Sequence, residues 1–139
     1  MNLLFRSFCS YHAHLRRFQT QKSAHATMPE GFEPFLMVKR KDAMSATAVL
    51  RVTFRVRRMN GWQLKALPVL GIPFFAGMPG FVSKVYGVDK RSNTFMGQYE
   101  WRSAKDAQSY INSGAGRFMR KNAFLHTIQY EIEDKEPAV

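Results

Sequence analysis

Four segments of the chain alternate apolar and polar residues with a period of two, and this pattern restricts the available folds more than any other feature. The segments are Thr47–Met59, Phe81–Asp89, Thr94–Trp101 and His126–Glu133. Successive side chains of a strand point to opposite faces of a sheet, so this alternation, rich in β-branched and aromatic residues, predicts four strands. The loop Lys90–Asn93 has the length of a hairpin connection, which predicts that the second and third strands are antiparallel neighbours.

Two other segments have the patterns of helices. Trp62–Gly77 is apolar nearly all round, which is typical of a helix buried on several sides, and Pro68 and Pro73 break it. Ser103 is a favourable N-cap residue, and Asp106 completes a start that resembles a capping box. The order β-α-β-β-α-β predicts a ferredoxin-like α+β sandwich, with an antiparallel sheet and both helices on one face.

The first part of the chain differs in composition from the rest. No acidic residue precedes Glu30, whereas Arg, Ser, Thr and His are frequent. This composition is typical of a mitochondrial transit peptide, a disordered tail, or a leader before a true start at Met28. Pro29, Gly31 and Pro34 then interrupt regular structure.

These features predict the domain organisation. We expect residues 1–45 to be a disordered basic tail or targeting segment with a linker, and residues 46–134 to be the ferredoxin-like domain. We expect residues 135–139 to be a C-terminal tail. The sequence leaves the location open between the cytoplasm and, if residues 1–27 are a transit peptide, mitochondria.

The charge and the cysteine count limit the chemistry. The chain has 21 Lys and Arg against 10 Asp and Glu, a formal net charge of +11, which attracts anionic ligands, nucleic acid or membrane surfaces. Its one cysteine, Cys9, excludes an intramolecular disulfide and a cysteine-based metal site. No His, Cys and acid cluster has metal-ligand spacing, and no phosphate-binding glycine loop occurs, so we expect no metal and no cofactor. The best candidate for a membrane span, Ala66–Val82, is short and contains three prolines, so we expect no transmembrane segment.

A sheet covered by helices on one side leaves its other face for a ligand, a partner or water. The apolar residues of the first strand should face the helices, which puts Arg51 on the other face. If the pleats align, Lys84, Tyr86, Tyr99 and Trp101 join Arg51 in a cavity with aromatic and cationic walls. Such a cavity suits a planar anionic or phenolic ligand. The alternatives are that the arginines form a solvated face and that Trp101 belongs to the core.

Two single residues add to this hypothesis. A glycine within a strand marks a bulge or leaves space above it, so Gly97, two residues from Tyr99, predicts a hollow rimmed by rings. His126 is the only histidine of the predicted domain and has an unperturbed pKa near neutrality, which makes it a candidate proton acceptor. The alternative for His126 is a structural role at the start of a strand.

Three stretches resemble the antibiotic-biosynthesis-monooxygenase-like proteins of the dimeric α+β barrel superfamily. They are PGFVSKVYGVD, FMGQYEWRSAKDAQSYINS and HTIQYEI, and the resemblance covers roughly Leu50–Ile132. IPFFAGMPGF is similar to an uncharacterised subgroup. The resemblance implies a homodimer whose two sheets face each other and close into a barrel. It also implies that a flat phenolic substrate is oxidised by dioxygen without metal or flavin, beside a tryptophan that Trp101 matches. The family's amide side chain four residues earlier is replaced by Gly97.

The first functional hypothesis is therefore a dimeric barrel that binds a planar aromatic or phenolic small molecule, with cofactor-independent monooxygenase activity as the enzyme hypothesis. Arg51 and Lys84 would contact an anionic group, and Tyr86, Gly97, Tyr99 and Trp101 would surround the ring. His126 and Trp101 are the candidate catalytic residues. A barrel that only binds a ligand or assembles is the alternative within this class.

The second hypothesis is single-stranded RNA binding. The RNA-recognition motif has the same order of elements and stacks bases on aromatic residues of its strands. Phe95, Tyr99 and Trp101 would supply these residues here, although the third strand lacks the opening basic-Gly-aromatic pattern of that motif. We therefore regard nucleic acid as the less favoured partner.

Overall fold

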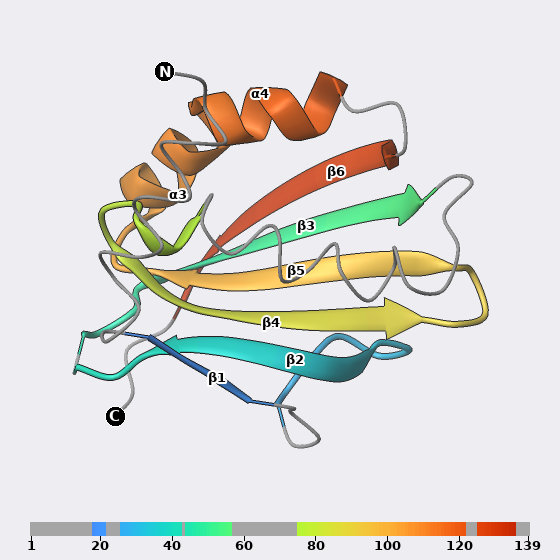
Figure 1. The fold of residues 1–139 in the computed structure, drawn as a ribbon, viewed down its shortest axis with the longest axis horizontal. Helices are drawn as coiled ribbons and strands as arrows, with labels where there is room; N and C mark the ends of the chain where they lie inside the picture. The colour runs from blue at the N-terminus through green and yellow to red at the C-terminus, as the bar shows by residue number, and fades with distance from the viewer. Residues whose placement is uncertain (1–17, 22–25, 43, 57–74, 122–124, 136–139) are drawn as a thin grey trace.

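The computed structural model describes residues 18–21, 26–42, 44–56, 75–121 and 125–135 (Figure 1). In these ranges six strands form one antiparallel sheet in the order β1-β2-β4-β5-β3-β6. The strands are β1 (Phe18–Gln21), β2 (Glu33–Arg40), β3 (Ala48–Val56), β4 (Phe81–Asp89), β5 (Thr94–Trp101) and β6 (Leu125–Asp134). The described helices are α3 (Ala104–Asn112) and α4 (Gly114–Lys121).

The ferredoxin-like fold predicted from the sequence is confirmed. The predicted strands are β3, β4, β5 and β6, and β3 lies at the centre of this group, between β5 and β6. Ser103 caps α3 by accepting a hydrogen bond from the Asp106 amide at 3.1 Å. The predicted helix Trp62–Gly77 lies largely outside the described residues, and Phe75 and Ala76 are helical at its end.

The linker predicted before residue 46 is wrong for β2, which lies inside the sheet between β1 and β4. Val38 of this strand is fully buried. The described pairing of β1 covers Met37–Arg40 and ends before Pro34, and proline is tolerated in a sheet at an edge or at a bulge, where its missing amide hydrogen costs little. The register shifts between Pro34 and Leu36, as at a β-bulge. Gly31, with φ of 95°, forms the turn before the strand.

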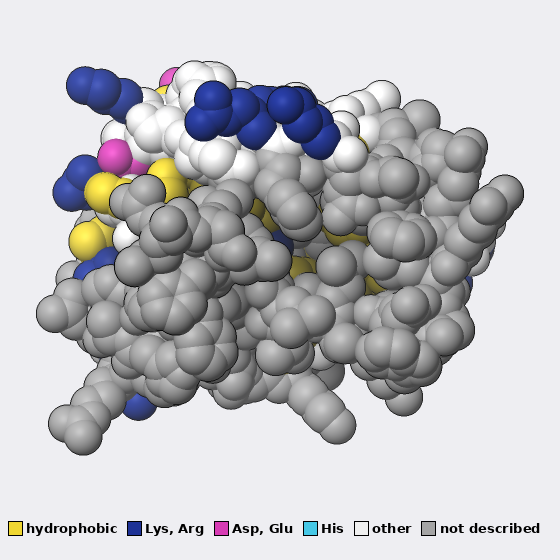
Figure 2. All heavy atoms as spheres, turned by 45° about the horizontal axis from the view of Figure 1, so that its top comes forward, with side chains coloured by type: hydrophobic (Ala, Val, Ile, Leu, Met, Phe, Trp, Pro, Cys, Tyr) yellow, Lys and Arg dark blue, Asp and Glu magenta, His cyan; other side chains and the backbone are white. Residues whose placement is uncertain are grey.

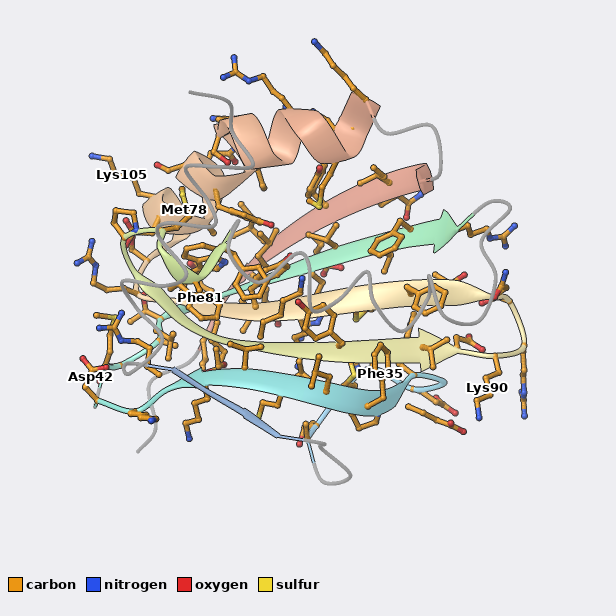
Figure 3. All side chains as sticks on the ribbon, in the orientation of Figure 1. Phe35, Asp42, Met78, Phe81, Lys90 and Lys105 are labelled. Atoms are coloured by element: carbon orange, nitrogen blue, oxygen red, sulfur yellow. The ribbon has the colours of Figure 1, made fainter. Side chains whose placement is uncertain are left out.

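The register of the sheet determines which side chains face the helices. Leu50 lies opposite Tyr99, Val52 lies opposite Gly97, and Ala48 lies opposite Trp101. Directly opposite residues of an antiparallel pair point to the same face. The buried residues of α3 pack against this face, and they are Ala107, Tyr110 and Ile111. The hydrophobic core therefore lies between the sheet and the helices, and Met78 and Phe81 lie at the end of the sheet next to α3 (Figure 3).

The opposite face of the sheet, which we call the outer face, contacts the segment before β2. The Gln98 side-chain amide donates to the Thr27 carbonyl at 2.8 Å. The Met28 thioether occupies the space that a Cβ on Gly87 would need. Val85 and Met96 of the outer face are buried as well, at 6% exposure each. The disorder expected for the first 45 residues is therefore also wrong for Thr27 and Met28.

The surface of the helical layer is basic. Lys and Arg side chains gather there (Figure 2), and α4 contributes the exposed residues Arg117, Arg120 and Lys121. Within the described ranges, the helices are too short or too polar to span a lipid bilayer.

Candidate functional site

The strand β4 carries a lysine into the core. Lys84 is only 8% exposed, in a stretch of β4 that is buried from Phe81 to Gly87. Its partner across the β4–β5 pair is Tyr99, so the two side chains share the helix-facing side of the sheet. Among the described residues, Lys84 has no hydrogen-bond or ion-pair partner. Lysine is almost never this buried without a partner, which marks the position as unusual.

Three aromatic rings take the place of a partner for this amine. The Lys84 Nζ lies 4.1 Å from the ring centroid of Tyr86, 4.4 Å from that of Tyr99 and 4.5 Å from that of Phe75. Each distance is within the range of a cation–π interaction, in which the electron-rich ring face attracts the ammonium. We call Phe75, Lys84, Tyr86 and Tyr99 the Lys84 site.

Burial changes the protonation of this site. Removal of the ammonium from water lowers the pKa of Lys84 well below its ordinary value of 10.5, and the rings offset part of that cost. A lysine with a lowered pKa supplies a neutral amine, which is a base and a nucleophile, at a lower pH than an exposed lysine does.

The neighbouring tyrosines change in the opposite sense. Burial raises the pKa of Tyr86 and of Tyr99 well above the ordinary value, and it raises the pKa of Tyr110 to about 12. The Tyr99 and Tyr110 hydroxyl oxygens are 3.2 Å apart and form a buried hydrogen bond. These hydroxyls therefore stay protonated and remain potential proton donors next to the Lys84 site.

Trp101 continues the aromatic cluster toward α3. Its side chain is fully buried, with ring centroids 5.3 Å from Tyr110, 5.7 Å from Phe81 and 6.1 Å from Tyr99. The indole nitrogen has no hydrogen-bond partner among the described residues, and the same is true of the buried Tyr130 hydroxyl. A buried donor without a partner costs free energy, so both atoms would gain from a polar ligand atom.

Gly97 provides space for Lys84. A Cβ at Gly97 would lie 2.8 Å from the Lys84 Cε and 3.1 Å from the Tyr99 Cε1. The sequence predicted a hollow rimmed by rings above this glycine, but the space above Gly97 is not empty. The Lys84 side chain fills it, so the glycine accommodates the lysine in the core.

The close packing of Lys84 on Gly97 leads to the first prediction. We expect Gly97→Ala to lower the free energy of unfolding by roughly 1–2 kcal/mol, because overpacking outweighs the intrinsic gain of alanine over glycine in a strand. In a Lys84→Ala background the loss should shrink, because the atom that clashes has been removed. Urea unfolding of the four proteins of this double-mutant cycle measures both quantities. A loss that is equal in the two backgrounds would contradict the contact.

Arg51 lies on the outer face, so the predicted cavity that combined it with the Lys84 site is wrong. It lies opposite Gln98, whereas Leu50 lies opposite Tyr99, and a shift of one residue reverses the face of every side chain. The Arg51 guanidinium donates to the Gln98 Oε1 at 3.0 Å and to the Glu133 Oε2 at 2.6 Å. It also lines an open groove of about 400 Å³ with Thr53, Met96, Gln129, Tyr130 and Glu131.

The structure brings together four other residues named from the sequence, Lys84, Tyr86, Gly97 and Tyr99, and Trp101 adjoins them. His126 lies on β6 opposite Arg55, and its side chain is outside the described part of the chain. Phe75 was missed, because its helical segment was interpreted only as core. Among the described residues, no group of three His, Cys, Asp or Glu is placed to hold a metal ion.

The aromatic residues named for RNA binding are not on an open face. Tyr99 is 1% exposed and Trp101 is fully buried. Phe95 lies opposite Phe54, and their rings stack with centroids 6.0 Å apart. Bases stack on aromatic residues of an exposed sheet surface, so this arrangement does not support the predicted RNA platform.

Comparison with known proteins supports the same fold. No protein-family model and no curated protein matches the chain. A structure from Fusobacterium nucleatum, provisionally described as a monooxygenase, superposes with a TM-score of 0.53 at 10% identity, over 75% of this chain and 52% of that one. The chain thus spans about half the length of that protein. A major regulator of staphylococcal pathogenesis gives a TM-score of 0.57 at 10% identity, with 90% and 89% of the two chains covered.

The third structure is related to the same family that the sequence motifs resemble. It is a ferredoxin-fold protein from Listeria monocytogenes that is related to antibiotic biosynthesis monooxygenases, with a TM-score of 0.51 at 15% identity over 82% of this chain and 70% of that one. At such identities the likeness concerns the fold alone. The chain therefore has the ferredoxin-like fold that is found in proteins related to antibiotic biosynthesis monooxygenases.

Proposed function

We propose that this protein binds a planar aromatic or phenolic small molecule between its sheet and its helices, at the Lys84 site. The observation that carries the proposal is a buried amine that lies against three aromatic rings without an ion-pair partner among the described residues. A planar ligand would stack on these rings, and its hydroxyl or carboxylate would give the amine a partner of opposite character. The monooxygenase descriptions of two structural neighbours agree with such a ligand.

The proposed reaction is oxidation of that ligand by dioxygen without a cofactor. The neutral Lys84 amine accepts the proton of a bound phenol, and the ammonium then pairs with the phenolate oxygen. The electron-rich anion reacts with dioxygen: one oxygen atom enters the substrate in place of two hydrogens, and the other leaves as water. The substrate supplies all the electrons. In this proposal Lys84 takes the role that the sequence suggested for His126.

A homodimer belongs to the same proposal. The outer face has polar residues such as Arg51 and Gln98 beside the buried Val85 and Met96. A second sheet placed against this face would close the barrel that the sequence resemblance implies. Light scattering on a sizing column reports the mass of the full chain directly, and a monomer at micromolar concentration would contradict this part of the proposal.

The test of ligand binding compares two lysine variants. Dihydroxynaphthoates and anthrones are titrated into the full chain with calorimetry as the readout, and dioxygen uptake is followed with each compound that binds. We expect Lys84→Met to raise Kd by about tenfold or more, because a charge-assisted hydrogen bond is lost. Lys105→Met is the matched control, because Lys105 is exposed and points away from the sheet (Figure 3). Failure of all compounds to bind, or an equal effect of the two variants, would overturn the proposal.

A further inference from the structure

We propose that Lys84 is a covalent carbonyl-binding site, at which its amine forms an imine with an aromatic aldehyde or ketone. The inference deepens the proposed function and rests on it, because an aromatic carbonyl compound must reach the same rings as a phenol.

The geometry around the amine is that of a nucleophile held in an apolar setting. The three ring centroids lie 4.1–4.5 Å from Nζ, on Phe75, Tyr86 and Tyr99. The ion pairs among the described residues belong to Arg40, Arg51, Lys90, Arg102 and Lys135, so no carboxylate in this part of the chain holds Lys84 as an ammonium. An amine that is desolvated in this way attacks carbonyl carbon more readily than an ion-paired amine.

The surroundings of Nζ also select the electrophile. Exposed lysines react with any aldehyde in solution, whereas an amine among three rings favours a carbonyl that carries a ring of its own. Gly97 lies directly opposite Tyr86 on the neighbouring strand and adds no side-chain bulk beside Nζ. An aromatic carbonyl compound is therefore the class of ligand that fits this amine.

The reaction balances without an oxidant or a reductant. The nitrogen lone pair attacks the carbonyl carbon, the carbonyl electron pair moves to oxygen, and a proton passes from nitrogen to oxygen to give a carbinolamine. Protonation of the hydroxyl, loss of water and formation of the carbon–nitrogen double bond give the imine. Tyr99 is the available proton donor, because its hydroxyl stays protonated and is bonded to that of Tyr110 at 3.2 Å. Amine and carbonyl are consumed, and imine and water are formed.

The experiment uses the full chain with limiting salicylaldehyde at about neutral pH, where exposed lysines are almost entirely protonated. Borohydride reduces any imine to a stable secondary amine, and peptide mapping by mass spectrometry locates the adduct. We expect the occupancy of Lys84 to exceed that of the exposed lysines Lys39, Lys90 and Lys105 by about tenfold or more, because the desolvated amine is the stronger nucleophile. The preference should disappear in urea, and Lys84→Met, which removes the amine and suits the apolar surroundings, should remove this adduct without changing the circular dichroism spectrum.

A parallel titration separates this inference from the proposed function. Salicyl alcohol has the same phenol ring but no carbonyl group, so it tests binding without imine formation. Binding of the alcohol without preferential labelling of Lys84 would overturn the covalent inference and leave the proposed function standing. Absence of both binding and labelling would overturn both. Adducts spread evenly over the surface lysines also count against the inference.

Discussion

Trp101→Ala should lower the free energy of unfolding by about 3–5 kcal/mol, the usual cost of truncating a buried aromatic side chain. Trp101 is fully buried and joins β5 to α3 through its contact with Tyr110, while Phe81 packs against it in a T-shaped arrangement. Truncation leaves a cavity where the sheet meets the helical layer. Because small domains are stable by only about 5–15 kcal/mol, this loss is a large fraction of the total.

Urea unfolding followed by circular dichroism measures this effect. Trp101→Phe is the matched variant, because it keeps an aromatic ring and removes only part of the volume, and its loss should be clearly smaller. A loss below about 1 kcal/mol for the alanine variant would contradict the core position of Trp101, because such values are typical of exposed sites. It would favour the ligand-contact role that the sequence suggested.

In contrast to Trp101→Ala, Lys84→Met should raise the free energy of unfolding, by roughly 1–3 kcal/mol at neutral pH. The reason is that a buried polar group without a partner is replaced by an apolar chain of similar length. The gain depends on pH. Burial lowers the pKa of Lys84 in the folded state, so between that lowered pKa and the ordinary value of 10.5 the unfolded chain binds more protons. The stability of the wild-type chain therefore rises with pH through this window, and the advantage of the methionine variant shrinks.

The measurement is a set of urea unfolding curves for both proteins from about pH 6 to about pH 9.5, below the ordinary pKa of tyrosine. Tyr86, Tyr99 and Tyr110 have raised pKa values, so the fold loses stability above that range as unfolded tyrosines ionise. Their effect is common to both proteins and cancels in the difference. Lys105→Met should show no comparable pH dependence. An advantage of Lys84→Met that stays constant with pH would mean that the amine is not desolvated.

If Lys84 is kept in the core for function, Lys84→Met should both stabilise the fold and weaken ligand binding. Proteins commonly keep unfavourable groups where activity requires them and lose activity when those groups are replaced. For Lys84→Met, the unfolding measurement thus reports what the buried amine costs the fold, and the Kd reports what it contributes to ligand binding. Greater stability with unchanged binding would assign Lys84 no role in the proposed site.

The sequence predicted the fold better than the site. β3 to β6 were found because alternation with a period of two survives in each of them. β2 was missed because Pro34 suggested a break, whereas the strand accommodates this proline next to a shift of its register with β4. Such pairing is decided by distant segments and is not encoded locally.

The sequence grouped Lys84, Tyr86, Tyr99 and Trp101 on one face, as the structure does, but it assigned them to the open face and not to the face that meets the helices. Alternation groups Lys84 with Tyr86, and Tyr99 with Trp101, but it does not say which face of one strand meets which face of the next. The pairing of Leu50 with Tyr99 settles this and moves Arg51 to the outer face. One local signal was present: Phe81–Gly87 contains a single charged residue in an otherwise uncharged run, which is typical of a strand buried on both faces.

The contact of Thr27 and Met28 with the outer face makes any association there an exchange reaction. A second sheet that approached this face would first have to displace the hydrogen bond from Gln98 to Thr27 and the packing of Met28 on Gly87. The apparent association constant would then be the intrinsic constant multiplied by the fraction of molecules in which the segment leaves the sheet uncovered. Truncating the Met28 side chain with Met28→Ala would weaken this cover and strengthen such association without altering any residue of the sheet itself.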